Sequence, residues 1–229
     1  MTTPHVAPPA LVVFDCDGVL VDSERLMQVE FSAMLHEIGL PMSAEETART
    51  FLGRSMPNCL QIIEARLGHP APDGFLDALQ VRAFASFARA LEPVPGAPAL
   101  LDTLDAAGIP YCVASSGSHE KMRTTLGRTG LLARLEGRLT SSLEAARGKP
   151  FPDVFLLAAS RMGVAAAACV VIEDSPLGIE AARSAGMRAI GLAGLMPADR
   201  LAAAGATHVV THLEQVAPLL GLAPATTPP

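Results

Sequence analysis

Four apolar residues, Leu11-Val12-Val13-Phe14, run directly into Asp15-Cys16-Asp17-Gly18. A continuous run of β-branched and aromatic residues is typical of a strand covered on both faces, as in parallel α/β sheets, which bind their ligands beyond the carboxyl ends of the strands. Because side chains repeat every two residues along an extended chain, Asp15 and Asp17 are expected to face one site, while Gly18 lets the chain turn away. Asp and Gly are also common turn residues, so the motif alone describes a plain turn equally well.

Beyond residue 92, helical apolar spacing alternates with short apolar runs. Helices are expected over residues 97–107, from residue 120, and over residues 153–162. The short runs predict strands over residues 109–115, 137–142, 169–174, 188–192 and 208–211. Alternating α and β elements are typical of a parallel sheet with helices on both faces. The predicted fold is therefore α/β, with a doubly wound, Rossmann-like parallel sheet as its core.

Residues 23–92 interrupt this alternation with apolar residues at helical spacing and no convincing strand. An insertion of about seventy residues is too long for a loop. It is expected to form an all-helical cap domain above the carboxyl edge of the sheet, where a lid would lie. The domain prediction is a core of residues 10–24 and 93–221 with a cap of residues 25–92. The ends, residues 1–9 and 222–229, are rich in Pro, Thr and Ala and are expected to be unstructured arms.

Composition narrows the class of protein. A chain of 229 residues with 50% hydrophobic content can bury a full core. A net charge of -6 argues against nucleic acid as a partner. No apolar stretch approaches the roughly 20 residues of a membrane span, and residues 1–9 lack the features of a signal peptide. We expect a cytoplasmic protein with no membrane partner and, since no heptad pattern is present, a monomer.

Further polar groups follow two of the later predicted strands. Ser115 and Ser116 end one strand and open a helix, so their hydroxyl and N–H groups suit an anion such as phosphate. Glu173 and Asp174 end another strand and supply the hard oxygen ligands that magnesium prefers. Taken singly, each of these groups is also explained as a helix cap. Their combination is what suggests a site.

Lysine is scarce in this chain. Of the 17 basic residues only Lys121 and Lys149 are lysines, so a mechanism that needs one has two candidates. Lys149 lies in Gly148-Lys149-Pro150-Phe151-Pro152-Asp153, where two prolines stiffen the loop before a helix. A lone loop lysine is usually solvated, but here a cation is expected to face the acids at the strand ends.

The longer signatures in the chain are Asp15-Cys16-Asp17-Gly18-Val19-Leu20-Val21-Asp22-Ser23-Glu24, Gly148-Lys149-Pro150 with Pro152-Asp153-Val154-Phe155, and Ile172-Glu173-Asp174-Ser175-Pro176-Leu177-Gly178-Ile179. Together with Ser115 they resemble, in order and spacing, the four motifs of the haloacid dehalogenase-like superfamily. The resemblance covers nearly everything between the terminal arms. It points in particular to the subgroup of beta-phosphoglucomutase and sugar-phosphate phosphatases, which carry a helical cap after the first motif.

The resemblance implies a role for each residue. Asp15 would be the nucleophile that attacks a phosphate in line and forms an aspartyl-phosphate, and Asp17 would be the general acid and base. Ser115, the N–H of Ser116 and Lys149 would bind the phosphoryl oxygens. The implied cofactor is Mg2+. Its implied ligands are a carboxylate oxygen of Asp15, the backbone carbonyl of Asp17 and Asp174, with Glu173 in support.

Within the cap, the chain departs from beta-phosphoglucomutase. Alignment from Asp15 without a gap puts Met27 where the mutase has a histidine, and Arg54 lies two positions before the cap arginine of the mutase. Arg54 is thus a weak candidate for a substrate contact, equally well explained as a solvent-facing residue. The cap contains no lysine, which excludes the phosphonatase branch and its Schiff base. Asp17 argues against a true dehalogenase, because that branch lacks an aspartate at this position.

The leading hypothesis is a magnesium-dependent phosphatase that hydrolyses a small phosphorylated metabolite, a sugar or polyol phosphate, through an aspartyl-phosphate. The first alternative is a phosphosugar mutase of the beta-phosphoglucomutase type, which Met27 disfavours. A signalling receiver domain also combines a phosphorylated aspartate with a lysine, but its acidic pair comes first in the chain and it has no helical insertion. A silent binding protein is the last alternative, disfavoured because every reactive group is present.

Overall fold

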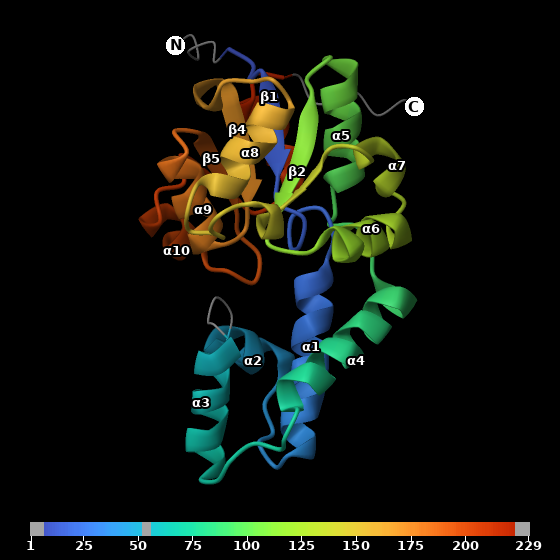
Figure 1. The fold of residues 1–229 in the computed structure, drawn as a ribbon, viewed down its shortest axis with the longest axis vertical. Helices are drawn as coiled ribbons and strands as arrows, with labels where there is room; N and C mark the ends of the chain where they lie inside the picture. Colours follow the sequence, from blue (N-terminus) through green and yellow to red (C-terminus); the bar gives the residue numbers. More distant parts are fainter. Residues whose placement is uncertain (1–6, 52–55, 223–229) are drawn as a thin grey trace.

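The computed structural model of the protein describes residues 7–51 and 56–222. They form an α/β core and a smaller helical body that extends from one end of it (Figure 1). Within these residues, no helix combines the length and the apolar character needed to cross a bilayer. Residues 1–6 and 223–229 of the predicted arms lie outside the described residues, and residues 7–9 and Leu222 belong to no helix or strand. The candidate Arg54 also lies outside the described residues.

The core is built on a parallel sheet. Over the described residues the sheet has six strands in the order β3-β2-β1-β4-β5-β6, and every neighbouring pair is parallel. The strands are β1 (Leu11–Phe14), β2 (Tyr111–Ser115), β3 (Leu139–Ser141), β4 (Cys169–Glu173), β5 (Arg188–Leu192) and β6 (His208–Val210). This is the strand order of a doubly wound sheet, so the predicted fold class is confirmed.

The direction in which strands are added reverses between β1 and β4. The register places Phe14 opposite Val113 on one side and opposite Ile172 on the other. One residue further on, the Asp15 N–H donates to the Ile172 carbonyl at 3.0 Å. In open parallel sheets, ligands bind in the crevice at such a reversal, beyond the carboxyl ends of the strands. The fold therefore brings the polar residues that follow β1 and β4 to the edge of one crevice.

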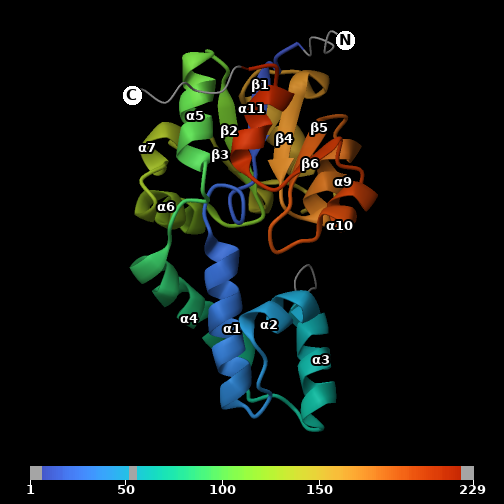
Figure 2. The same cartoon turned by 180° about the vertical axis from the view of Figure 1, so that it is seen from behind.

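Helices cover both faces of the sheet (Figures 1 and 2). One face is covered by α5 (Ala97–Ala106), α6 (His119–Arg128), α7 (Leu132–Leu135) and α11 (Val216–Leu219). The other is covered by α8 (Asp153–Arg161), α9 (Pro176–Ser184) and α10 (Ala198–Ala203). Short 3-10 turns occur at η1 (Ser142–Glu144), η2 (Ala166–Ala168) and η3 (Leu213–Gln215).

β1 shows why its sequence is apolar throughout. Val12 and Phe14 join the hydrophobic cluster that includes α5 and α6, whereas Leu11 and Val13 join the cluster that includes α8 and α9. All four side chains are fully buried. Because neighbours along a strand point to opposite faces, a strand covered on both sides needs an apolar residue at every position.

The helical body consists of α1 (Ser23–Glu37), α2 (Ala44–Phe51), α3 (Met56–Leu67) and α4 (Phe75–Ala90). It has a hydrophobic core of its own, in which the ring of Phe31 lies 4.8 Å from that of Phe51 and 6.3 Å from that of Phe75. Aromatic pairs at these distances add about 0.5–1.5 kcal/mol to the effect of apolar burial. The predicted all-helical insertion is thus confirmed, and its helices pack around their own core.

Two crossings join the helical body to the core. The Asp22 N–H donates to the Glu92 carbonyl and the Val94 N–H donates to the Leu20 carbonyl, each at 3.0 Å, so the crossings lie side by side. Near them, Leu26 at the start of α1 belongs to the hydrophobic cluster of the core. The exact domain boundaries, at residues 24/25 and 92/93, stay a prediction.

The predicted strands are present, some of them a residue shorter at the carboxyl end, and two of them begin two residues later than the apolar runs. The run from residue 109 becomes a strand only at Tyr111, because the Ile109 N–H donates to the Leu104 carbonyl at 2.9 Å and Pro110 has no N–H for a ladder. The run from residue 137 becomes a strand only at Leu139, because Gly137 has a φ of 78°. Local backbone chemistry at the strand starts explains both differences.

Glu144 joins three elements at the edge of the core. It accepts hydrogen bonds from Arg161 of α8 at 2.8 and 3.1 Å, from the Ser141 N–H at 2.9 Å, and contacts His119 of α6 at 2.6 Å. The hydrogen bonds from Arg161 and Ser141 lower the pKa of Glu144 from 4.5 to about 2. The carboxylate therefore stabilises the folded state wherever it is ionised.

We expect Glu144→Gln to lower the free energy of unfolding by about 1 kcal/mol at pH 7. The loss is modest because the Arg161–Glu144 ion pair is partly exposed and screened by solvent. The folded pKa lies below the unfolded value, so the stabilisation is present above pH 4.5 and is lost as the pH falls toward about 2. Urea unfolding of both proteins at several pH values measures the difference. A difference that stays constant down to pH 2 would contradict the role of the ionised carboxylate.

Candidate active site

A cavity of about 320 Å³ opens at the carboxyl edge of the sheet, where the strand order reverses. Its lining residues are Asp15, Asp17, Glu24, Ser115, Ser116, Gly117, Lys121, Lys149, Glu173, Asp174 and Ser175. Five carboxyl groups and two lysines thus line one space, which we call the polar chamber. An excess of buried carboxyl groups over cations makes this chamber suited to a ligand that brings positive charge with it.

Lys149 lies at the centre of the charged contacts in the polar chamber. Its Nζ donates to Asp15 Oδ1 at 2.6 Å, to Glu173 Oε1 at 2.7 Å and to the Ala114 carbonyl at 3.1 Å. Nζ also lies 4.9 Å from the centre of the Phe155 ring. Burial lowers the pKa of Lys149, but the two carboxylates outweigh it, so the pKa is raised and the lysine stays charged.

Asp15 follows β1 directly and is buried. Burial raises the pKa of its carboxyl group, Lys149 opposes that rise, and the charges of Glu173 and Asp17 add to it. The 2.6 Å contact with the Lys149 ammonium is the interaction that favours the ionised form. Asp15 thus presents a carboxylate, held by one cation, at the open end of a rigid strand.

Asp17 lies two residues further on and is held through both oxygens. The Ser23 hydroxyl donates to Oδ1 at 2.6 Å, and the Lys121 ammonium donates to Oδ2 at 2.7 Å. Ser23 begins α1 and Lys121 lies in the first turn of α6, so two helices determine the orientation of this carboxyl group. Asp15 and Asp17 both line the polar chamber, as their spacing predicts.

Residues 115–118, the serine loop, connect β2 to α6. The Ser115 hydroxyl accepts a hydrogen bond from the Gly117 N–H at 3.0 Å, and Ser141 of β3 donates to the Gly117 carbonyl at 2.6 Å. Ser118 caps α6 by accepting from the Lys121 N–H at 3.2 Å. The loop is therefore held from both sides, with Ser115 and Ser116 in the wall of the polar chamber.

Glu173 is almost fully buried and uses both of its oxygens. Oε1 accepts from Lys149, and Oε2 accepts from the N–H and the hydroxyl of Ser175, each at 2.8 Å. Gly178 in the first turn of α9 makes room for this carboxylate, because a Cβ there would overlap it. Glu173 thus fixes the position of Lys149 relative to the sheet.

Asp174 lies beside the turn that follows β1. Gly18 has a φ of 77°, and a Cβ at this position would overlap the Asp174 carboxylate. Burial, and then the charges of Glu173 and Asp15, raise the pKa of Asp174 well above its usual value. Glycine is therefore required at position 18 for two reasons: the backbone there is left-handed, and the Asp174 side chain lies too close for a Cβ.

The acidic groups fit a hard divalent cation. Burial raises the pKa of both Asp15 and Asp174, and the charge of Asp15 adds to the rise at Asp174, so a cation between them would relieve that repulsion. In the described residues, no set of three or more His, Cys, Asp or Glu side chains is already arranged as metal ligands. The predicted magnesium ligands do not require three such side chains, because they are the carboxylates of Asp15 and Asp174 and the backbone carbonyl of Asp17. Glu173 is engaged by Lys149 and Ser175, so its support would be indirect.

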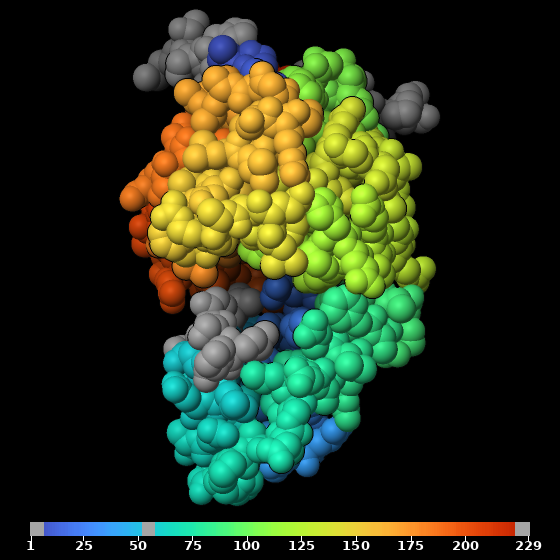
Figure 3. All heavy atoms as spheres, in the orientation of Figure 1, coloured from blue at the N-terminus to red at the C-terminus, as the bar shows by residue number. Residues whose placement is uncertain are grey.

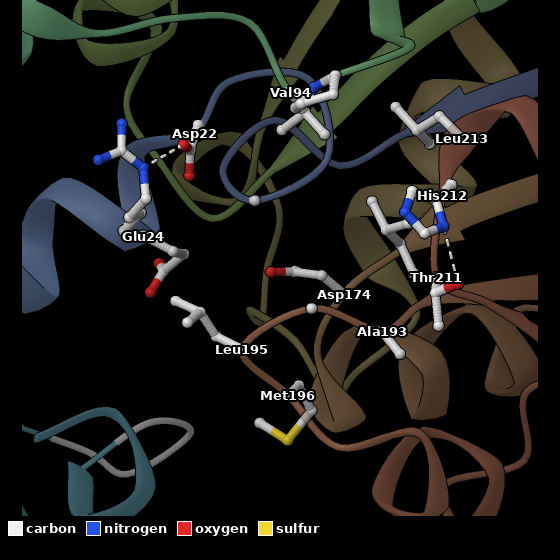
Figure 4. Close-up of a pocket in the computed structure, with 15 residues that line it drawn as sticks. Asp22, Glu24, Val94, Asp174, Ala193, Leu195, Met196, Thr211, His212 and Leu213 are labelled. Carbon is white, nitrogen blue, oxygen red and sulfur yellow. Dashed lines mark hydrogen bonds and ion pairs between the residues drawn. The ribbon is translucent and has the colours of Figure 1, made fainter. Parts of the chain in front are cut away.

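A second cavity, also of about 320 Å³, shares Glu24 and Asp174 with the polar chamber. Figure 4 shows these two carboxylates turned toward the same space. The remaining wall is mainly apolar and comes from the crossings and from the loops after β5 and β6, with Val94, Leu195 and Met196 among its residues. We call it the apolar pocket.

A third cavity, of about 520 Å³, adjoins the polar chamber at Gly117 and Lys121. The helical body supplies most of its wall, and we call it the cap cavity. Its lining residues are Met27, Leu76, Asp77, Leu79, Gln80, Phe84, Phe87, Gly117, Ser118 and Lys121. Figure 3 shows the helical body and the core meeting along this side of the molecule. The polar chamber therefore adjoins two further cavities, one toward the loops after β5 and β6 and one toward the helical body.

Seven predicted site residues line the polar chamber, namely Asp15, Asp17, Ser115, Ser116, Lys149, Glu173 and Asp174. Their individual roles stay predictions. Sequence reasoning did not place Lys121 or Ser23 among the site residues, although both hold Asp17. The signal for Lys121 was available, because it is one of two lysines and follows the serine loop by three residues. Nothing in the local sequence indicates that Ser23 contacts Asp17.

Comparison with known proteins agrees with this geometry. A family model described as haloacid dehalogenase-like hydrolase matches residues 9–186. The chain is 32% identical over 180 residues to the 6-phosphogluconate phosphatase of Escherichia coli K12, covering 77% of this chain and 79% of that protein. It is 33% identical over 205 residues to hexitol phosphatase A of the same bacterium, covering 89% and 91%.

A solved structure shares the whole architecture. An HAD-family hydrolase from Deinococcus radiodurans, determined with bound phosphate and sodium, matches with a TM-score of 0.85 and 31% identity. The match covers 96% of this chain and 100% of that one. Both the sheet and the helical body are therefore shared.

We expect Gly178→Ala to lower the free energy of unfolding by about 2 kcal/mol, because the new methyl group displaces Glu173 and removes hydrogen bonds to a charged group. In an ordinary helix the same change stabilises by about 0.5–1 kcal/mol. Urea unfolding measures the effect on stability. Binding of inorganic phosphate to the polar chamber should weaken as well, because Lys149 loses one of its partners.

Gly127→Ala in α6 is the matched control. A Cβ there meets only Leu132 Cδ2, at 3.7 Å, which is an ordinary contact. This variant should be at least as stable as the wild type. Equal stability of the two variants would show that Glu173 has room to move, contrary to the structure.

Proposed function

The chain belongs to the haloacid dehalogenase-like hydrolases and is a phosphoric monoester hydrolase, and we propose that it hydrolyses a small phosphorylated sugar or polyol with Mg2+ through a phosphorylated Asp15. The observation that supports this most directly is the placement of Lys149, 2.6 Å from Asp15 and 2.7 Å from Glu173. The Lys149 contact favours the ionised form of Asp15 against burial, which raises its pKa to about 7, and Asp15 lines a cavity together with two serines that precede α6.

In the first proposed step, a carboxylate oxygen of Asp15 attacks phosphorus in line with the ester bond. A new bond forms between that oxygen and phosphorus while the ester bond breaks. Asp17 gives its proton to the departing oxygen, which leaves as an alcohol. The Ser115 hydroxyl, the Ser116 N–H and the Lys149 ammonium bind the other phosphoryl oxygens and stabilise the charge that develops on them.

In the second proposed step, water attacks the phosphorus of the phosphorylated Asp15. Asp17 now accepts a proton from that water, and the bond between phosphorus and Asp15 breaks. Inorganic phosphate is released and both carboxyl groups regain their starting forms. The same residue thus serves as acid and then as base, which requires that it stay close to the phosphorus throughout.

Magnesium would be held by Asp15, the Asp17 carbonyl and Asp174, with Glu173 in support. When bound, it offsets negative charge on the phosphoryl oxygens. The raised pKa of Asp174, caused by burial and then by the charges of Glu173 and Asp15, supports this placement, because a cation would favour its ionised form.

The substrate class is proposed from the cavities and from the relatives. The polar chamber accommodates a phosphoryl group, and the adjoining cap cavity limits the size of what is attached to it. The relatives named above act on 6-phosphogluconate and hexitol phosphates, as their names state. A small phosphorylated sugar or polyol is the class common to both. A monomeric state and a cytoplasmic location stay predictions.

The mutase alternative is less well supported. Met27, which takes the place of the mutase histidine in the resemblance, lines the cap cavity and packs against both the core and the cap clusters. A thioether cannot exchange a proton with a sugar hydroxyl. The receiver alternative does not fit the family membership, and the geometry retains every group needed for catalysis, which disfavours a silent binding protein.

The test is phosphate release from a panel of sugar, polyol and nucleotide monophosphates, with Mg2+ or with EDTA. We expect Mg2+-dependent release that EDTA abolishes, and a fall of about 1000-fold or more for Asp15→Asn, which removes the nucleophile. Asp199→Asn, the same chemical change at an exposed position of α10, should keep full activity.

The same samples distinguish hydrolysis from transfer. Glucose 1-phosphate is followed for conversion to glucose 6-phosphate as well as for release of phosphate. Isomerisation without release would replace the phosphatase proposal with the mutase. Undiminished hydrolysis by Asp15→Asn would reject the phosphorylated aspartate.

A further inference from the structure

Lys121 has no task in the proposed chemistry, yet it makes one of the closest charged contacts in the polar chamber. Its Nζ lies 2.7 Å from Asp17 Oδ2, across 104 positions of sequence. The exposed fractions of the two side chains are 26% for Lys121 and 16% for Asp17. Ion pairs sheltered from water are stronger than exposed ones, which are often worth little. The contact is therefore a built feature of the chamber.

The position of Lys121 is otherwise unfavourable for a cation. It lies in the first turn of α6, whose N-terminus carries partial positive charge. Its side chain is also only 26% exposed, and partial burial disfavours a charged group unless a partner is close. The helix and the burial both disfavour this ammonium, and Asp17 is the group that compensates for them.

Asp17 is held on its other side by Ser23. The Ser23 hydroxyl is buried and donates to Oδ1 at 2.6 Å, while Lys121 donates to Oδ2. Two donors from two different helices fix the rotation of the carboxyl plane, which a single donor would leave free. Each oxygen keeps a second lone pair, so the group remains able to exchange a proton with a substrate.

We propose that Lys121 is a positioning residue that, together with Ser23, holds the carboxyl group of Asp17 toward the ester oxygen of the bound substrate. The inference rests on the proposed function, in which the Asp17 proton passes to the leaving oxygen as the ester bond breaks. That proton is replaced by one from the attacking water, so Lys121 keeps its own proton throughout. A poorly oriented Asp17 would slow departure of the leaving oxygen and the later attack of water, and only the first of these effects depends on the leaving group.

The same placement indicates the side from which the leaving group departs. Lys121 lines both the polar chamber and the cap cavity. The apolar pocket instead meets the chamber at Glu24 and Asp174 (Figure 4). An acid serves only an oxygen within hydrogen-bond reach. The leaving oxygen therefore lies on the side of Asp17 and Lys121, next to the cap cavity.

The test uses Lys121→Met, which keeps the length of the side chain and removes its charge. With the sugar or polyol phosphate that the wild type hydrolyses fastest, we expect kcat to fall about 10- to 100-fold and KM to change less than about threefold. With 4-nitrophenyl phosphate, whose leaving group needs no proton, kcat/KM should fall less than about threefold, because kcat/KM reports formation of the phosphorylated Asp15 and not its hydrolysis. A merely structural role would lower both rates alike.

A double-mutant cycle with Asp17→Asn tests whether Lys121 acts through Asp17. In that background, Lys121→Met should cause less than about a twofold further loss on the sugar phosphate. Lys121→Arg should recover most of the activity, because a guanidinium still donates to the carboxylate. Ser23→Ala should lower kcat in the same substrate-dependent way as Lys121→Met, since it frees the other oxygen.

Arg123→Met is the matched control, because Arg123 lies on the same helix and pairs with Glu136 at 3.3 Å at the exposed surface. It should leave both rates unchanged. Thermal unfolding of every variant identifies any that fail to fold. If Lys121→Met is among them, the activities of Lys121→Arg and Ser23→Ala on the two substrates test the inference instead.

Three results would overturn the inference: a raised KM with unchanged kcat, equal losses on both substrates, or Lys121→Met indistinguishable from Arg123→Met. Failure of the proposed function is a different result. It is a wild type that releases no phosphate from any ester in the presence of Mg2+.

Discussion

The ammonium of Lys149 is the interaction on which the candidate active site depends. It lies 2.6 Å from Asp15 and 2.7 Å from Glu173, which follow or end two neighbouring strands. Two buried carboxylates so close together would otherwise repel one another and take up a proton. Removal of one partner from such a buried network typically costs about 3–5 kcal/mol, because it leaves an uncompensated charge. The acidic strand ends and the lysine loop are therefore mutually necessary.

The surrounding structure keeps this network in place by close packing and not by further charge. Gly178 leaves room for Glu173 at the start of α9, and Gly18 leaves room for Asp174 beside the turn after β1. The second oxygen of Glu173 is held by Ser175, which also caps α9. The helix that covers the sheet and the carboxylate that orients Lys149 thus share one anchor, so packing of the core and geometry of the site are coupled.

Much of this could be predicted from the sequence. The apolar run of β1, the alternation of elements and the helical insertion identified the fold, and the residues at strand ends identified most of the chamber wall. What could not be predicted is the network around Asp17. Lys121 follows the serine loop on α6 and Ser23 opens α1, and only the folded chain brings both to one carboxyl group. Arg54, the one cap candidate, lies outside the described residues.

The sequence by itself determined which segments become strands and helices, because apolar periodicity and turn residues act over a few neighbouring positions. It also determined which chemical groups end each strand. The tertiary structure alone decided which of those groups meet. The contacts of Lys149 with Asp15 and of Lys121 with Asp17 span 134 and 104 residues, and they depend on β1 lying between β2 and β4. Strand order is a property of the whole chain, since it minimises exposed apolar surface over all elements together.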